Sequence, residues 1–516
     1  MSRARRKGEV SISDFAPVAG VNIGDSPINL TDQELSRSMN GYYPRQSRLW
    51  TVRPPMSAVT SVANSLNDPI LKATSYYNGT TQYVVCASGG NLYQMTKAIF
   101  EGATPTWTII GALTDSTTKP SMLTFNSQLL IADGGSDIRY WDGSTYGVLT
   151  NSPSGTTALL EARNRVVANS SFADSVYFST AEFTGIDFDQ GSGSIILKAG
   201  FGDGLSVNAL SIAPGGNAVV VSKANNDQGE YQLRLIDVTD NTAANWSVSD
   251  PFVNKEAAQN AHGILNTSNS VFFFDETGIK RVEPTDQYGD LQSSPIFGDR
   301  INKQFSLFDA KVQEITYLPS LTAFIVLIKN HAQQYLYFPR NNAWCFWRLG
   351  EVIIDSITTV DEVIYLFGNN GITWKLDASK NVASDEVVPG GTEINIQSYG
   401  RTKRIVNRGY DIRLRRSTIY TTPKVSGVIA LKAIISDGSD VPLGNIALEG
   451  GISLLGLADG LLGEADELLG DDGAKLQTSS IWGGPRSKGI QIEWSADGAS
   501  YEMDYIQTEI EGPLGG

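Results

Sequence analysis

Histidine and cysteine, the side chains that most often bind metals or act as bases and nucleophiles, are scarce in this chain of 516 residues. The two histidines, His262 and His331, are far apart in sequence, and so are the two cysteines, Cys86 and Cys345. Two cysteines cannot form a disulfide scaffold or a thiolate metal cage, and two histidines cannot supply a multi-histidine metal centre. Both histidines stand near expected turns. We therefore expect turn or surface positions for them and no base catalysis by imidazole.

Motifs of other reaction classes are absent or incomplete. The chain contains no Gly-x-Ser-x-Gly, no Gly-x4-Gly-Lys and no His-Glu-x2-His. The string Ser495-Ala-Asp-Gly-Ala-Ser-Tyr is the nearest match to a sialidase turn, but its spacing differs. Asp187-Phe-Asp-Gln-Gly matches part of a calcium loop, although one short Asp-x-Asp more often forms a plain turn. We predict that the protein is not an enzyme and that it binds no metal or other cofactor.

Charged residues gather in two segments of opposite sign. Seven basic residues lie between positions 401 and 416, and six acidic residues lie between 459 and 472. They could be two solvated faces, or complementary surfaces across a subunit interface; alternatively, the basic segment could form a ring that faces DNA. The residues that we assign to a candidate subunit interface are Arg401, Lys403, Arg404, Arg408, Arg413, Arg415, Arg416, Asp466, Glu467, Asp471 and Asp472.

Composition predicts that the chain folds mainly into short strands, which would then position the charged residues named above. Charged residues make up 18% of the chain, below the ~25% of an average soluble domain. The 51 glycines and the 9% of aromatic residues favour short strands joined by tight turns over helix bundles.

A repeat underlies these strands. Seven segments share the order strand, turn, apolar strand, polar turn and further strand, with a period of about 47 residues, which is typical of a β-propeller. One small sheet cannot bury both faces, whereas sheets arranged radially cover one another. We predict six or seven blades; a pair of β-sandwiches is the alternative. The segments begin at Leu71, Ser121, Thr157, Val207, Gly263, Val312 and Ile354.

Three parts follow from this pattern. Residues 1–56 are predicted to be an N-terminal arm that packs on the C-terminal domain or on a neighbouring subunit, with a short helix opening at Thr31. Residues 57–390 are predicted to form the propeller and residues 391–516 a β-sandwich-like domain. Within the latter, the insert 447–476 repeats Leu-Leu-Gly every seven residues. It is either a flexible loop or an amphipathic element that docks on another subunit or touches a membrane.

Net charge limits the partners. The chain carries −15 charges and has a pI near 4.7, which argues against tight, non-specific binding of duplex DNA. No secretory signal peptide is visible behind Met1, and the longest apolar run, Ala323–Ile328, is far shorter than a membrane span.

Five strings remain to be interpreted. Three lie near the N-terminus: Asp25-Ser-Pro-Ile-Asn-Leu, Met39-Asn-Gly-Tyr-Tyr-Pro and Leu49-Trp-Thr-Val-Arg-Pro-Pro. Two lie in blade segments: Arg165-Val-Val-Ala with Val176-Tyr-Phe-Ser, and Tyr335-Leu-Tyr-Phe-Pro-Arg-Asn-Asn-Ala-Trp. These strings resemble the tail tubular (nozzle) proteins and packaged-DNA stabilisation proteins of short-tailed bacteriophages, although Pro55 stands where the family has glycine.

This resemblance implies a virion protein of the tail, made in the host cytoplasm. It implies a homo-oligomeric ring, most simply a hexamer, below the portal-adaptor (head-tail connector) protein. Such a ring closes the filled head, contacts tail fibre or tail needle proteins, and conducts genomic DNA without sequence-specific binding. The alternative function is a carbohydrate-binding or glycan-hydrolysing propeller that acts in receptor recognition.

Overall fold

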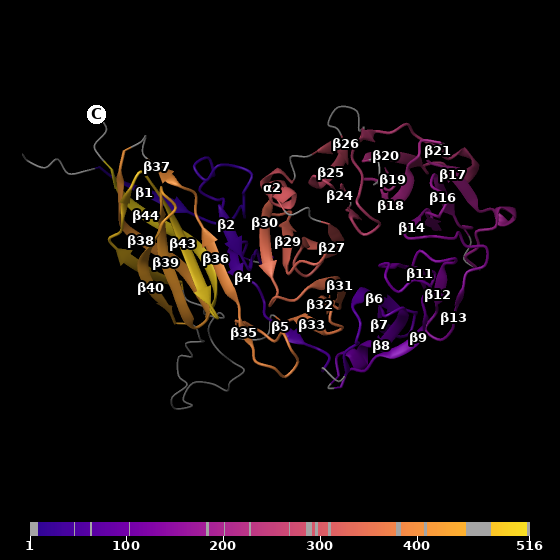
Figure 1. Cartoon of the computed structure of the whole chain (residues 1–516), viewed down its shortest axis with the longest axis horizontal. Helices are drawn as coiled ribbons and strands as arrows, with labels where there is room; N and C mark the ends of the chain where they lie inside the picture. The colour runs from indigo at the N-terminus through magenta and orange to yellow at the C-terminus, as the bar shows by residue number, and fades with distance from the viewer. Residues whose placement is uncertain are drawn as a thin grey trace, which may run out of the picture.

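The computed structural model describes residues 9–512 apart from 46, 62–63, 103, 182–184, 201, 226–228, 268, 285–290, 295–297, 308–310, 378–382, 407–409 and 450–475. A ring of small sheets lies beside a two-layered sandwich (Figure 1). The predicted all-β class, with a propeller and an additional sandwich-like domain, is confirmed.

Seven antiparallel sheets form the ring, and all but the seventh run in chain order from the innermost to the outermost strand. Blade 1 contains β6 (Ile70–Tyr77), β7 (Gln82–Ser88), β8 (Asn91–Thr96) and β9 (Thr108–Ala112), and blade 2 contains β10 (Ser121–Phe125), β11 (Gln128–Ala132), β12 (Arg139–Trp141) and β13 (Tyr146–Val148). Blade 3 contains β14 (Leu159–Ala162), β15 (Arg165–Ala168), β16 (Ser175–Phe178) and β17 (Ile195–Lys198). Blade 4 contains β18 (Ser206–Ile212), β19 (Ala218–Asn225), β20 (Glu230–Asp237), β21 (Ser247–Val248) and the additional β22 (Val253–Asn254).

The remaining three blades complete the ring. Blade 5 contains β23 (Ile264–Asn266), β24 (Val271–Asp275), β25 (Gly278–Pro284) and β26 (Leu291–Ser294). Blade 6 contains β27 (Val312–Leu318), β28 (Ala323–Ile328), β29 (Gln333–Phe338) and β30 (Ala343–Arg348). Blade 7 contains β31 (Ile354–Val360), β32 (Val363–Gly368), β33 (Thr373–Leu376) and β5 (Met56–Ala58).

The seventh blade takes its outermost strand from the other end of the propeller sequence. Strand β5 pairs with β33, Met56 opposite Leu376 and Ala58 opposite Trp374. The innermost strands β31 and β6 also contact each other. The ring is therefore closed by a strand that precedes the first blade.

Burial explains the apolar middle strands. Every residue of β24 and of β28 is buried, because neighbouring blades cover both faces of each sheet. Helices are few: α1 (Lys97–Phe100), α2 (Asp299–Leu307) and the 3-10 turns η2 (Gln190–Ser192) and η3 (Ala243–Asn245). No helix among the described residues is long and apolar enough to cross a membrane.

Two sheets form the sandwich. One sheet, here called the outer sheet, contains β1 (Glu9–Phe15), β3 (Gly41–Tyr42), β4 (Trp50–Val52), β38 (Ile412–Val425), β41 (Gln477–Trp482), β42 (Arg486–Ser487) and β44 (Ser500–Gly512). The second sheet contains β2 (Arg37–Met39), β36 (Gln397–Arg401), β37 (Ile405–Val406), β39 (Gly427–Ile435), β40 (Asp440–Leu448) and β43 (Gly489–Asp497). The short pair β34 (Ser384–Asp385) and β35 (Ile394–Asn395) links propeller and sandwich.

The N-terminal region is woven into both parts. Strand β1 pairs with β44 along its whole length, β2 pairs with β36, and β4 pairs with β44 before the chain enters blade 7 as β5. The predicted helix at Thr31 is wrong. A turn stands there, in which the Thr31 N–H donates to Glu34 Oε2 at 3.0 Å, so a capping-box contact forms without a helix.

Candidate functional site

The polar centre of the propeller is built on irregular inner strands. Four innermost strands carry a β-bulge near their first residues, which leaves Leu71, Asn208, Gln313 and Asp355 without a partner in the ladder. A bulge twists a strand and re-aims the neighbouring side chains. Three of these bulges lie next to charged or hydroxyl side chains that meet one another.

Glu314, on β27 of blade 6, is the hub of this cluster. Its Oε1 lies 2.6 Å from Lys72 Nζ of blade 1, and its Oε2 lies 2.6 Å from Lys119 Nζ, just before blade 2. Ser356 Oγ of blade 7 donates to Oε2 at 3.2 Å. One carboxylate therefore joins four blades.

His262, just before blade 5, completes the cluster. Its Nε2 lies 3.1 Å from the carbonyl oxygen of Lys119, and Lys119 Nζ donates to the carbonyl oxygen of Asp355 at 2.5 Å. Blades 2 and 5 are not neighbours in the ring, so these contacts cross the axis. The expectation that His262 occupies a turn holds, but its ring faces the propeller centre.

Burial and the ion pairs set the protonation of this cluster. Burial lowers the pKa of His262 to about 3, aided by the charges of Lys119 and Lys72. Burial also lowers the pKa of Lys119 to about 8, although Glu314 opposes that shift. Burial would raise the pKa of Glu314, but the two lysines outweigh it and hold the value at about 2. Near neutral pH the cluster thus holds a neutral imidazole beside a carboxylate shared by two ammonium groups.

A second polar centre joins propeller and sandwich. Arg53, which is buried, donates from Nη1 to Asp385 Oδ1 at 2.9 Å and pairs through Nη2 with the other oxygen of that carboxylate. Its Nε donates to Asn40 Oδ1 at 3.1 Å, and Nη2 donates to the carbonyl oxygen of Arg348 at 3.0 Å. The guanidinium therefore contacts the arm, blade 6 and the segment that leads to the sandwich.

Asn40 extends this junction. Its N–H donates to the carbonyl oxygen of Phe346 in blade 6 at 2.7 Å, and its Nδ2 donates to that of Gln397 in β36 at 2.8 Å. The neighbouring residues add a hydrogen bond, from Trp347 Nε1 to the Gly41 carbonyl oxygen at 2.8 Å, and an aromatic contact, in which Tyr42 packs edge-on against the Trp347 ring. Two of the three N-terminal strings that carry the family resemblance, those that begin at Met39 and Leu49, thus meet in space.

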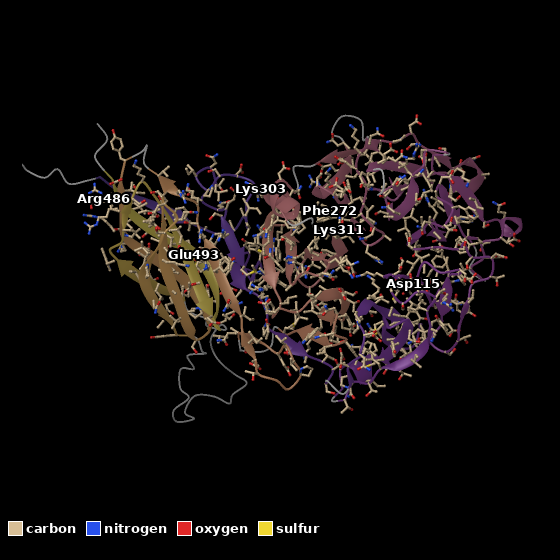
Figure 2. The ribbon with its side chains drawn as sticks, viewed as in Figure 1. Asp115, Phe272, Lys303, Lys311, Arg486 and Glu493 are labelled. Carbon is tan, nitrogen blue, oxygen red and sulfur yellow. The ribbon has the colours of Figure 1, made fainter. Side chains whose placement is uncertain are left out.

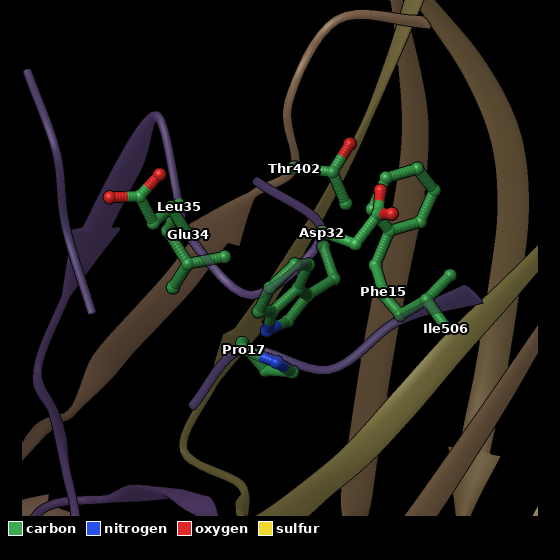
Figure 3. A pocket seen from close by; sticks show the side chains of 8 residues that line it. Phe15, Pro17, Asp32, Glu34, Leu35, Thr402 and Ile506 are labelled. Atoms are coloured by element: carbon green, nitrogen blue, oxygen red, sulfur yellow. The ribbon is translucent and has the colours of Figure 1, made fainter. Parts of the chain in front are cut away.

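Residues of the arm line two hollows. A groove of about 670 Å³ lies between the arm and blades 6 and 7, with Tyr42, Pro54, Leu321 and Ile364 in its lining. Figure 3 shows the other, a narrow pocket at Phe15 and Leu35 with no room for a water-sized molecule. No group of three or more His, Cys, Asp or Glu side chains in the described part of the chain is placed to hold a metal ion.

The structure divides the basic residues of the predicted interface between the two sheets. Arg401 on β36 pairs with Glu493 of the adjacent β43, and Lys403 Nζ lies 2.6 Å from Asp32 Oδ1. Arg404 Nη2 donates to Gln491 Oε1 at 3.3 Å. These three side chains bind partners in their own chain.

Three further basic residues, Arg413, Arg415 and Arg416, lie on β38 in the outer sheet. Arg415 Nε lies 3.2 Å from Glu511 Oε2, Arg416 pairs with Glu509, and Arg413 makes no ion pair with a described residue. Figure 2 labels Glu493 inside the sandwich and Arg486, a basic residue that the sequence analysis did not select, at its far end. The assigned residues Arg408, Asp466, Glu467, Asp471 and Asp472 lie outside the described residues.

Comparisons with known proteins give only distant similarity. No family model matches the chain, and no curated protein matches it. A crystal structure of the computationally designed Ika8 protein is 11% identical, with a TM-score of 0.37, over 62% of this chain and 100% of the other. The β-propeller domain of Myceliophteria thermophila Cps50 (Swd1) is 9% identical, with a TM-score of 0.42, over 63% of this chain and 100% of the other. Neither similarity bears on function.

Proposed function

We propose that the chain is a structural subunit of a short-tailed phage tail, forming a ring below the portal-adaptor that closes the filled head and conducts DNA during ejection. The observation that carries this proposal is the junction. Asn40, Gly41, Tyr42 and Arg53 belong to the strings that resemble the nozzle family, and they hold the sandwich against blade 6. A buried, multiply bonded junction suits a part that must transmit force without changing shape.

Charge is consistent with a DNA conduit. Residues 57–390 contain 20 Lys and Arg against 33 Asp and Glu, so the propeller region is strongly acidic. Acidic walls repel phosphate, and mobile cations screen them within ~8–10 Å at physiological salt. We expect the lining of the assembled channel to be neutral or negative, so that passing DNA is not held by ion pairs.

Native mass measurement of the purified protein, alone and after mixing with its portal-adaptor ring, tests the proposal. A closed ring, most simply a hexamer, is the expected species, alone or on the adaptor. A protein that stays monomeric in both settings contradicts the tail assignment. The alternative, a glycan-binding propeller, predicts instead a monomer or trimer that is retained on host surface polysaccharide, which a binding assay on the same sample detects.

A further inference from the structure

The outer sheet of the sandwich exposes large apolar side chains at its two edges and none between them. These side chains are Val10 and Ile12 on β1 and Trp482 on β41, with 59% of Ile12 and 70% of Trp482 exposed. Strands β44 and β38 lie between the edges and expose no large apolar side chain (Figure 1). Apolar groups that gather at particular places on a surface mark contact sites, whereas singly scattered ones do not.

The backbone of both edge strands is also unpaired on one side. Among the described residues, β1 pairs only with β44 and β41 pairs only with β38. No other backbone hydrogen bond from the described part of the chain reaches residues 9–15 or 477–482. Every second residue of these strands therefore directs its N–H and C=O groups away from the sheet. Such a row of free backbone groups can pair with a strand of another chain.

The second sheet of the sandwich shows how this chain protects an edge. Its edge strand β40 contains Pro442, which has no N–H, and a register shift next to Gly444 interrupts its ladder with β39. The opposite edge strand, β2, contacts β30 of blade 6. Strands β1 and β41 contain no proline, glycine, lysine or arginine. They therefore lack the features that keep edge strands from pairing.

The strand directions make the two edges complementary to each other. Strand β1 is antiparallel to β44, β44 to β38, and β38 to β41, so β1 and β41 run in opposite directions. A second copy that is rotated about an axis parallel to the strands keeps these directions, and its β41 then lies antiparallel to β1 of the first copy. The two strands have similar lengths, seven and six residues. They can therefore form an antiparallel ladder like those within the sheet.

The faces of the sheet limit the register of that ladder. Ile12 lies opposite Glu509, Glu509 opposite Arg416, and Arg416 opposite Trp482, with the Arg416 guanidinium 4.7 Å from the centre of the indole. A ladder that continues this row places Ile12 of one copy opposite Trp482 of the next. A β-branched side chain opposite an aromatic one is a favourable cross-strand pair. A slip by one residue would instead put the two side chains on opposite faces.

Charge favours contact between unlike edges over contact between like ones. Strand β1 contains two acidic residues and no basic one, and its Asp14 is exposed. Strand β42 continues the β41 edge along β38 and contains Arg486, whose side chain is mostly exposed. Two β1 strands would bring carboxylates together and would leave β41 unpaired, whereas β1 beside the β41 edge brings opposite charges together.

We infer that β1 of one copy pairs with β41 of a second copy, so that the outer sheets of neighbouring copies join into one continuous antiparallel sheet. The contact is heterologous because it joins two different surfaces, and heterologous contacts that close produce rings. The inference names the joining surfaces of the ring in the proposed function, and it rests on that proposal.

Disulfide trapping between two variants tests this pairing. Ile12→Cys and Trp482→Cys are purified separately, mixed and oxidised, and the native Cys86 and Cys345 are buried. We expect a covalent dimer on a non-reducing gel, since directly opposite residues bring their Cβ atoms to ~4.5–5.5 Å. Within one chain, three strand spacings separate the two positions by about 14 Å, too far for a disulfide. The bond therefore reports contact between copies.

The control for trapping replaces Ile12→Cys by Ile109→Cys. Ile109 lies on β9, the outermost strand of blade 1, and 58% of it is exposed, so it matches Ile12 in type, exposure and edge position. Cross-linking to Trp482→Cys no stronger than in this control overturns the inference. A dimer that Ile12→Cys forms more readily with itself than with Trp482→Cys also overturns it.

A lysine at the β1 edge gives an independent measurement on the full chain, alone and on the portal-adaptor ring. Ile12→Lys should raise the dissociation constant for self-association on the order of tenfold in sedimentation velocity, because it buries a charge in the contact. Ile109→Lys should leave that constant unchanged. Both residues are exposed, so both variants should keep the thermal unfolding midpoint of the wild type. Amide hydrogen exchange of β1 and β41 should be slower in the wild-type assembly than in the diluted monomer.

The outcomes separate this inference from the proposed function. If Ile12→Lys forms rings as readily as the wild type does, the edges are wrong while the proposed function stands. If the covalent dimers form as expected but native mass measurement finds open-ended chains instead of a closed ring, the edge pairing stands and the proposed ring fails.

Discussion

At the residue scale, Glu314 joins side chains of several blades and so helps to hold the propeller closed. Glu314→Gln would leave Lys72 and Lys119 buried without their carboxylate, and breaking a buried ion pair costs about 3 kcal/mol or more. Urea unfolding should show that loss, and the exposed Glu362→Gln should show almost none. Adding Lys119→Met to Glu314→Gln should recover part of the loss. An unchanged unfolding midpoint for Glu314→Gln would contradict the role assigned to it.

His262 makes a separate prediction about pH. Its pKa in the folded protein is lowered to about 3, below the ~6.5 of an unfolded chain. Above pH 6.5 the ring is neutral in both states, and the free energy of unfolding has its full value. As the pH falls from 6.5 towards 3, the unfolded chain binds a proton at this ring and the folded protein does not, so the free energy of unfolding decreases. At pH 5 the loss is about 2 kcal/mol. Glu314, with a folded pKa of about 2, adds its own loss only below its unfolded pKa of ~4.3.

The pH dependence is measured as the free energy of unfolding at pH 7 and pH 5 for the wild type and for His262→Gln. The variant should lose less stability between these two values, because the titrating ring is gone. Equal losses in both proteins would show that other groups dominate this range.

At the element scale, the short strands of the arm depend on close packing at Gly41. A Cβ at this position would lie 2.0 Å from Trp50 Nε1, whose N–H donates to Ser38 Oγ. Gly41→Ala should therefore destabilise the protein by about 3 kcal/mol, through displacement of a buried indole. Gly185→Ala is the matched control, since a Cβ there meets nothing within 4 Å. Thermal unfolding of the two variants compares them, and equal midpoints would remove the packing argument.

The strands that sequence reasoning could find are those with their own periodicity. Runs such as Phe272-Phe-Phe and Phe324-Ile-Val-Leu are apolar at successive positions because blades cover them on both faces, and they reveal the repeat. Strands β2 to β5 have two or three residues each, too few to show any period. The partners of β2, β4 and β5, in β36, β44 and β33, lie hundreds of residues away, and β3 pairs, among the described residues, only with the similarly short β4. Tertiary pairing alone therefore defines the strands of the arm.

The candidate sites also differ in how far the sequence predicts them, because some depend on adjacent residues and others on contacts between distant segments. The basic segment 401–416 is visible because its residues are adjacent in sequence. Lys72, Lys119, His262 and Glu314 are single polar residues at the starts of separate repeats, and only the closed ring brings them together. The sequence does contain one signal, namely charged residues at the first strand of repeats that are otherwise apolar. Burying such a charge costs free energy unless it is paired, so these residues indicate buried partners elsewhere in the chain. Asn40 and Arg53 stand in strings that resemble the nozzle family, but nothing in the sequence shows that Arg53 meets both Asn40 and Asp385.

At the scale of the whole molecule, the propeller and the sandwich share one apolar core, which runs from blades 5 to 7 through the arm into the sandwich, and buried polar contacts are added to it. Strands β2 and β3 contact β30 of blade 6, and β5 belongs to blade 7, so the arm passes between the two parts (Figure 1). Arg53 and Asp385 are the charged residues of this passage, with side chains only 1% and 3% exposed. This pair therefore adds a buried ionic contact to the apolar packing that joins the two parts.

Removing one member of that pair should uncouple the two parts. Arg53→Met leaves the Asp385 carboxylate buried without its guanidinium, which costs about 3–5 kcal/mol at the junction. Calorimetry should then resolve two unfolding transitions, and limited proteolysis should cut near residues 378–390. Arg53→Met/Asp385→Leu removes both charges and should recover much of the loss, since an apolar pair of similar volume is often as stable as a buried ion pair. If Arg53→Met unfolds in the same transition and at the same temperature as the wild type, the many backbone bonds of the arm, rather than this ion pair, carry the coupling.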